Sequence, residues 1–141
     1  MSIKILVNGP FVDVRVSDVI TDEDLPPLLD AFDSARRRGP FVVLTDTLEM
    51  KSAPRQVLMR FAEGLKQLPP MKGVWLGDAV VIRSPLARFA VSTLVLVAPL
   101  PTEIKVFEAR YEAERWCAQL LDRARIHVPE PLTSSPVAQR R

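Results

Sequence analysis

Cysteine, histidine and glycine are scarce in this sequence, and each scarcity argues against a class of function. The 141 residues include one cysteine, one histidine and five glycines. A lone thiol, Cys117, forms no internal disulfide and no thiolate metal cluster, and its place beside Trp116 favours a small buried residue. One histidine, His127, offers little to a catalytic triad, and scattered glycines make no phosphate-binding loop. We therefore expect no metal, no cofactor and no enzymatic activity.

Long hydrophobic runs and charge of one sign are also lacking. The most apolar run extends from Phe89 to Leu100, well short of the roughly 20 residues that a membrane-spanning helix needs. The first residues lack the hydrophobic core of a signal peptide. Lysine and arginine number 19 against 17 acidic residues, and no aromatic residues alternate with the basic clusters. We expect a cytoplasmic protein that neither spans a membrane nor binds nucleic acid.

Proline, by contrast, is abundant, and its placement marks the ends of structural elements. Most of the thirteen prolines fall between patterned segments rather than within them. The length and the hydrophobic share of 48% suit one domain with one core. We expect this domain to occupy residues 1–127. The segment 128–141 is rich in proline and serine and is expected to be a disordered tail.

Alternating strand and helix patterns predict an α/β fold. Residues 3–7 and 11–16 alternate in hydrophobicity around Asn8-Gly9, which predicts a hairpin. Helices are expected at 21–38, 52–68, 84–98 and 111–125. Further strands are expected at 41–44, within 74–82 (centred on 79–82) and at 104–107. This order predicts a mixed, mostly parallel sheet of about five strands with about four helices.

The segment after the strand at 41–44 carries a group of polar side chains. They are Thr45, Asp46, Thr47, Glu49 and Ser52. We expect Thr45, Asp46 and Thr47 to organise a loop at the end of the strand. Ser52 precedes Ala53-Pro54, where a serine hydroxyl can cap a helix N-terminus. A catalytic set and a phosphorylation site are the alternatives, and we favour the cap.

The segment 84–98 is predicted to be a helix that is apolar on nearly every side. Ser84 caps it and Pro85 takes its first position. Leu86, Phe89, Ala90, Leu94 and Val97 are assigned to the sheet, which leaves Val91, Val95 and Leu96 outward beside Arg88. A helix that is apolar on both sides is normally buried against other parts of a protein on both sides. We interpret Arg88, Val91, Val95 and Leu96 as a partner interface; the alternative is that the helix ends near Leu94.

The element order and the strand ending Leu44-Thr45-Asp46-Thr47 resemble the STAS domain of anti-sigma factor antagonists. A second pattern, Phe107-x5-Ala113-x2-Trp116, is similar to the ending of a bacterial SpoIIAA-like branch, although Cys117 stands where that pattern has leucine. The branch also has a weaker similarity to the lipid-binding CRAL-TRIO fold. The resemblance covers residues 3–125, nearly the whole predicted domain.

This resemblance implies a non-enzymatic bacterial regulatory protein that binds a protein partner, with a homodimer as one form. Some such domains are switched by phosphorylation at the start of the helix after the central strand, where Ser52 stands. The family's Asp-Ser-Ser-Gly motif is replaced here by Glu49-Met50-Lys51-Ser52. One alternative is an immunity or antitoxin protein that uses the same surface. A lipid or small-ligand carrier would need a closed apolar pocket, and an enzyme would need His127 beside Asp46 or Ser52.

Overall fold

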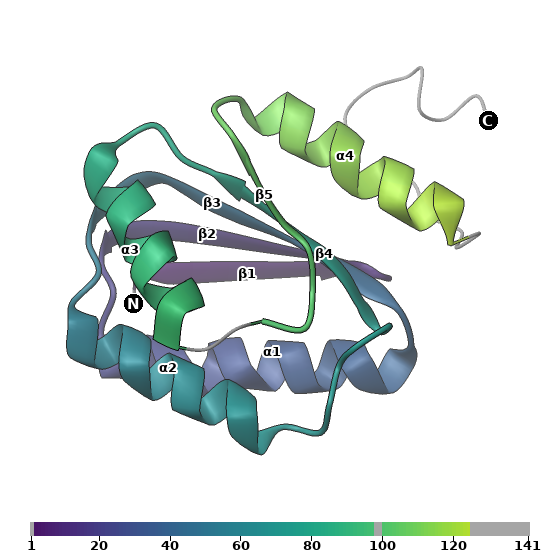
Figure 1. The fold of residues 1–141 in the computed structure, drawn as a ribbon, viewed down its shortest axis with the longest axis horizontal. Helices are drawn as coiled ribbons and strands as arrows, with labels where there is room; N and C mark the ends of the chain where they lie inside the picture. The colour runs from purple at the N-terminus through teal and green to yellow at the C-terminus, as the bar shows by residue number, and fades with distance from the viewer. Residues whose placement is uncertain (1, 98–99, 125–141) are drawn as a thin grey trace.

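The computed structural model describes residues 2–97 and 100–124 (Figure 1). The predicted tail at 128–141, His127 and the domain boundary at 127 lie outside the described residues. The elements are β1 (Ile3–Asn8), β2 (Phe11–Val19), the short 3-10 helix η1 (Asp22–Asp24), α1 (Leu25–Arg38), β3 (Phe41–Ser52), α2 (Arg55–Gln67), β4 (Trp75–Val81), α3 (Pro85–Val97), β5 (Ile104–Phe107) and α4 (Arg110–Arg123).

One five-stranded sheet forms the centre of the domain, in the order β1-β2-β3-β4-β5. β1 and β2 pair as the predicted antiparallel hairpin, in which Gly9 adopts a φ of 60°. The other neighbours pair in parallel. The predicted single α/β domain with a mixed, mostly parallel sheet is confirmed. No helix within residues 2–97 and 100–124 is long and apolar enough to cross a bilayer.

The strand order determines which face of the sheet each helix covers. Every parallel connection moves one strand further in the same direction, so right-handed crossovers place α1, α2 and α3 on one face. Among the helices within residues 2–97 and 100–124, only α4, which follows the last strand, covers the opposite face (Figure 1).

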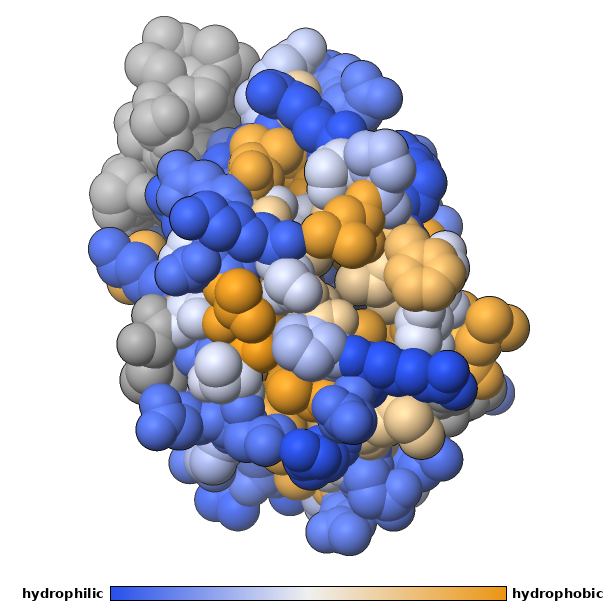
Figure 2. All heavy atoms as spheres, turned by 90° about the vertical axis from the view of Figure 1, so that its left-hand side faces the viewer, coloured by the Kyte–Doolittle hydropathy of each residue, from blue (hydrophilic) through white to orange (hydrophobic). Residues whose placement is uncertain are grey.

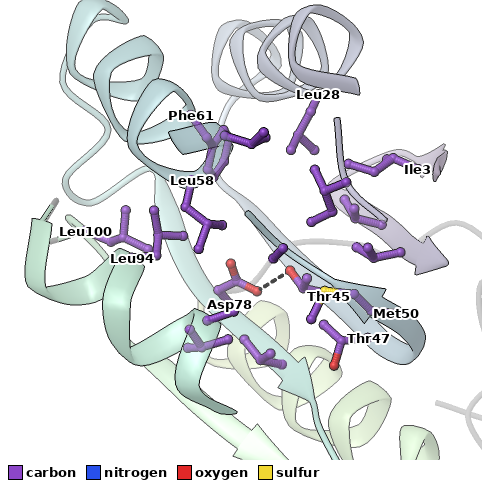
Figure 3. Close-up of a pocket in the computed structure, with 18 of the residues that line it drawn as sticks. Ile3, Leu28, Thr45, Thr47, Met50, Leu58, Phe61, Asp78, Leu94 and Leu100 are labelled. Carbon is purple, nitrogen blue, oxygen red and sulfur yellow. Dashed lines mark hydrogen bonds between the residues drawn. The ribbon is translucent and has the colours of Figure 1, made fainter. Parts of the chain in front are cut away.

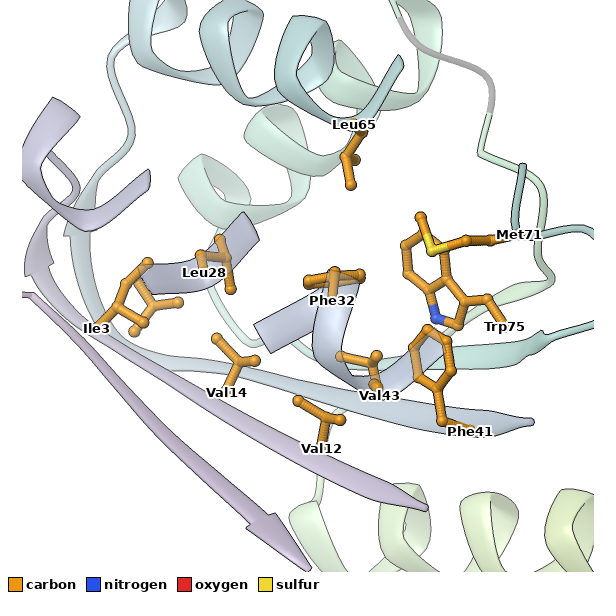
Figure 4. Packing of buried hydrophobic residues seen from close by; sticks show 12 residues of the cluster. Ile3, Val12, Val14, Leu28, Phe32, Phe41, Val43, Leu65, Met71 and Trp75 are labelled. Atoms are coloured by element: carbon orange, nitrogen blue, oxygen red, sulfur yellow. The ribbon is translucent and has the colours of Figure 1, made fainter. Parts of the chain in front are cut away.

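The core beneath α1 and α2 is built around aromatic rings. Phe32 projects from α1 toward Phe41 and Trp75 of the sheet (Figure 4). Its ring centroid lies 4.8 Å from that of Trp75, at an interplanar angle of 75°. The ring quadrupoles favour this edge-to-face arrangement, which adds to the stabilisation from burial of the two rings. Phe32, Phe41 and Trp75 thus anchor α1 to the adjacent strands β3 and β4.

The core beneath α4 is smaller and closely packed. Trp116, Cys117 and Leu121 pack against Val42, Leu44 and Ala79 of the sheet. Burial raises the pKa of the Cys117 thiol, which lies 3.8 Å from the Val43 carbonyl as its donor. The prediction that Cys117 is a small buried residue is confirmed.

An ion-pair cluster attaches the start of α4 to the sheet. The Arg110 guanidinium donates to Asp13 of β2, to Asp46 of β3 at 3.0 Å, and to Glu114 at 3.1 Å. Burial alone would lower the pKa of Arg110, but its hydrogen bonds and charge interactions with these carboxylates outweigh burial and raise it. One cation therefore joins two strands to α4.

The expectation of a loop at Thr45, Asp46 and Thr47 is wrong, because all three residues lie within β3. β2 continues to Val19, so it supplies β3 with a partner as far as Ser52. The β-branched Thr45 and Thr47 suit a strand, and the Thr47 hydroxyl donates to the Val81 carbonyl at 2.7 Å. Pairing between strands overrode the local tendency of these polar residues toward a turn.

The expectation that Ser52 caps a helix is also wrong. Ser52 is the last residue of β3, and its carbonyl accepts the Ile20 N–H at 3.1 Å. α2 begins three residues later, at Arg55, and no side chain caps it. The carbonyl of Pro54 instead begins the helical hydrogen bonding, with Val57 and Leu58 as donors. Ser52 therefore contributes through its backbone to the sheet.

The packing of α4 predicts a strong effect at Gly77. A Cβ at this position would overlap Leu120 and lie 2.8 Å from the Trp116 ring. We expect Gly77→Ala to lower the free energy of unfolding by about 1–3 kcal/mol because the core must be overpacked. Chemical denaturation measures this loss.

Gly64→Ala is the matched control. Its Cβ would meet only the flexible end of the Leu29 side chain, at 2.5 Å. Alanine also favours a helix interior by about 1 kcal/mol over glycine, so we expect little net change. Equal losses at Gly64 and Gly77 would contradict the close approach of α4 to β4.

Candidate functional site

α3 buries a narrow face of mostly small residues. Ala87 and Ala90 are buried, and Val91 and Leu94 are partly buried on the same side. Their spacing of i, i+3, i+4 and i+7 defines one side of a helix. Ser84 accepts the Ala87 N–H at 3.0 Å, which confirms the predicted cap of this helix.

The expected orientation of α3 about its axis is wrong for three residues. Leu86 and Phe89, assigned to the sheet, are exposed by 50% and 71%, whereas Val91, assigned to a partner, packs against Val80 and Ile82. Two alanines allow the helix to lie close to the sheet, and this directs the larger side chains outward. The sequence interpretation instead placed the largest apolar residues inside.

The outer face of α3 consists of Leu86, Phe89 and Leu96, and Leu96 is 82% exposed. Arg83 and Arg88 border a shallow groove beside Phe89, which also includes Ser84, Pro85 and Ser92. Figure 2 shows adjoining hydrophobic side chains on the side of the molecule where α2 and α3 begin, with hydrophilic side chains around them. Of the predicted interface residues, Arg88 and Leu96 are therefore exposed near Phe89, and Val95 is partly exposed.

Beneath α3 lies an apolar cavity of about 110 Å³. Its wall includes Ile3 and Leu28, Met50, Leu58 and Phe61, and Leu94 and Leu100, which converge from different elements (Figure 3). An empty cavity costs on the order of 24 cal/mol per Å³, so this volume would cost roughly 2–3 kcal/mol if left unfilled. A ligand carrier would need a closed apolar pocket, whereas the apolar cavity found here is partly open.

Asp78 is the ionisable side chain in the cavity wall. It lies on β4, is buried, and accepts a hydrogen bond from the Thr45 hydroxyl at 2.9 Å. One carboxyl oxygen receives this bond, and the other points into the cavity on the side of Leu58 (Figure 3). Burial raises the pKa of Asp78 to about 7, although the bond from Thr45 lowers it. Asp78 therefore titrates near neutral pH.

The predicted polar residues are divided by the alternation of β3. Thr45 and Thr47 line the cavity, whereas Asp46 points to the opposite face and pairs with Arg110. Ser52 lies at the end of β3, beyond Met50, which lines the cavity. The structure thus brings Thr45 and Thr47 together at one site and leaves Asp46 and Ser52 out of it.

Sequence interpretation missed Asp78. The available signal was an acidic residue within the apolar strand segment Trp75–Val81. A carboxyl at an internal position of a central strand is costly unless it has a partner or a function. The pairing of Thr45 with Val80 on the adjacent strand puts the Thr45 hydroxyl within reach of Asp78, and no local pattern shows this.

Solved structures of other proteins share the overall fold of this chain. A protein of the DUF3478 family from Shewanella loihica PV-4, described as having a SpoIIAA-like fold, is 20% identical, with a TM-score of 0.55 over 82% of this chain and 91% of that chain. An anti-sigma factor antagonist from Mycobacterium paratuberculosis is 17% identical, with a TM-score of 0.54 over 82% and 92%. Unphosphorylated SpoIIAA, an anti-sigma factor antagonist, is 13% identical, with a TM-score of 0.53 over 90% and 99%.

These likenesses define the fold of the chain as SpoIIAA-like, that is, STAS-like. The predicted resemblance is therefore confirmed at the level of fold. No family model matches the sequence, and no curated protein matches it. At these identities, shared fold does not establish shared function.

Asp78 predicts a dependence of stability on pH. The pKa of its carboxyl is raised in the fold to about 7, from 3.8, so between these values the unfolded chain binds fewer protons than the folded one. Stability from this group is therefore complete below about pH 4 and is lost as the pH rises toward 7. We expect wild type to lose on the order of 2–3 kcal/mol relative to Asp78→Asn between pH 5 and pH 8. Denaturant titrations at both pH values measure the difference, and a constant difference would contradict it.

Replacement of Ser52 should have little effect on stability, unlike replacement of a capping residue. Since its hydroxyl caps no helix, Ser52→Ala is expected to change the free energy of unfolding by less than about 0.5 kcal/mol. Ser84→Ala, which removes the bond to Ala87, should cost about 1 kcal/mol. Thermal melts of the two variants test the contrast, and a larger loss at Ser52 would restore the cap.

Proposed function

We propose that the chain is a non-enzymatic bacterial regulatory domain that acts in the cytoplasm by binding a protein partner. The outer face of α3 carries this proposal. Phe89 and Leu96 are large, apolar and more than two-thirds exposed, and Leu86 continues the same side of the helix. Covering such a surface is favourable by about 25 cal/mol per Å², before the costs of association.

The composition of the surface suits a protein rather than a small ligand. An exposed aromatic ring beside arginines has the character of an interface hot spot. Arg83 and Arg88 lie at the border of the groove beside Phe89, where they would favour a partner with acidic residues around an apolar centre. The anti-sigma factor antagonists with this fold are named for an action on another protein, which supports the same class of function.

Two finer features belong to the proposal. A second copy of the chain is one candidate partner, because an exposed apolar helix face can pair with itself about a two-fold axis. Ser52 remains the candidate phosphoacceptor, now as a partly buried residue at the end of β3, three residues before α2. An immunity or antitoxin role would use the same outer face, and the identity of the captured partner separates it from regulation.

The test is a comparison of charged variants on opposite faces of the sheet. The double variant Phe89→Glu, Leu96→Glu places two charges on the outer face of α3, so we expect it to lose at least tenfold in affinity for its partner. Tyr111→Glu is the matched control, because Tyr111 is a 63% exposed aromatic residue on α4. Chains of all 141 residues are immobilised and exposed to lysate of the source bacterium, and captured proteins are identified by mass spectrometry.

Sedimentation of the purified chains tests self-association in parallel. Loss of a specific partner, or of the dimer, in the double variant alone supports the proposal, provided that its melting temperature is unchanged. Retention of the same partners and mass by the double variant excludes this face.

A further inference from the structure

We infer that the cavity beneath α3 is a binding site for a small apolar amine, whose ammonium group pairs with Asp78. This inference is independent of the proposed protein partner, since it concerns the inner side of α3. It rests on the shape of the cavity, on the orientation of one carboxyl and on the absence of a counter-charge in the described cavity wall.

The size and lining of the cavity define the body of the ligand. A volume near 110 Å³ is far larger than the 10–15 Å³ that one water needs, and an engineered cavity of about 150 Å³ in another protein binds benzene. Apart from Asp78 and two threonines, the described side chains that line it are apolar or aromatic. A ring or short branched chain of roughly six to eight non-hydrogen atoms suits this space.

Asp78 defines the polar group of the ligand. Its side chain is more than nine-tenths buried, and Thr45 donates to Oδ1 only. Within residues 2–97 and 100–124, no hydrogen bond reaches Oδ2, which points into the cavity (Figure 3). A carboxylate accepts hydrogen bonds and carries negative charge, so its complement is a cationic donor.

The other ligand classes fit this wall less well. An anionic ligand would meet the carboxylate at close range, and no described lining residue is cationic. Above the pKa of Asp78, a neutral donor would satisfy Oδ2 but leave the buried charge uncompensated. An ammonium group supplies the donors and the charge together.

Access to the cavity is available beside α3. Val95 lines the cavity and is 38% exposed, so the space reaches the surface at the inner edge of this helix. Leu94, Leu100 and Ile104 border the same region and are only partly buried. A small ligand can therefore enter by movement of side chains at this edge.

The test uses the purified full chain with benzylamine as probe and ethylbenzene as its neutral analogue of equal size. Calorimetry at pH 8 measures both affinities in wild type and in Asp78→Asn. We expect the variant to weaken benzylamine binding at least tenfold and to leave ethylbenzene binding within twofold. Val91→Phe, which fills the inner side of α3, should weaken both probes.

The pH provides a second reading that needs no variant. Asp78 is the ionisable group among the described lining residues of the sheet, α1, α2 and α3, and the Cys117 thiol lies on the opposite face with a raised pKa. We expect the affinity of wild type for benzylamine to rise severalfold from pH 5 to pH 8, while that for ethylbenzene stays constant.

Three results would overturn the inference. They are no benzylamine binding at millimolar concentration, equal benzylamine binding by Asp78→Asn, and binding of ethylbenzene alone. The last would leave an apolar cavity without selectivity for amines. Since Phe89 and Leu96 lie outside the cavity lining, failure here leaves the partner experiment unaffected.

Discussion

The handedness of the connections between parallel strands governs this domain. Because β2, β3, β4 and β5 follow one another across the sheet, every crossover helix is placed on the same face. Three helices must then share the space above a narrow sheet, whereas α4 is the one helix in the described part of the chain that covers the other side. The face under α4 is filled closely enough that β4 needs a glycine at position 77. The side that α1, α2 and α3 share retains the cavity.

α3 separates the two surfaces that carry the functional proposals. Its inner side, with Ala90, Val91 and Leu94, forms part of the cavity wall, and its outer side presents Phe89 and Leu96. A ligand that fills the cavity and a partner that covers the outer face would therefore contact opposite sides of one helix. Any displacement of α3 by one of them changes the surface offered to the other, which is the requirement for coupling between two sites.

The sequence predicted those features that depend on neighbouring residues. Asn8-Gly9 defined the hairpin, and Ser84-Pro85 defined the start of α3. Features that depend on distant pairing were mispredicted. The strand character of Thr45 to Ser52 arises from the length of β2, and the rotation of α3 arises from how closely two alanines let it approach the sheet. Asp78 acquires its raised pKa only from burial in the assembled fold. Local patterns thus define elements, while the candidate sites depend on their packing.

The cavity also has a mechanical consequence for the domain. Space that the folded chain leaves unfilled disappears when the chain unfolds, so the unfolded state occupies a smaller total volume. We therefore expect the side of the sheet beneath α3, which holds the cavity, to be more compressible than the closely packed side beneath α4. Hydrostatic pressure would act first on the more compressible side, and a molecule occupying the cavity would stiffen that side against compression.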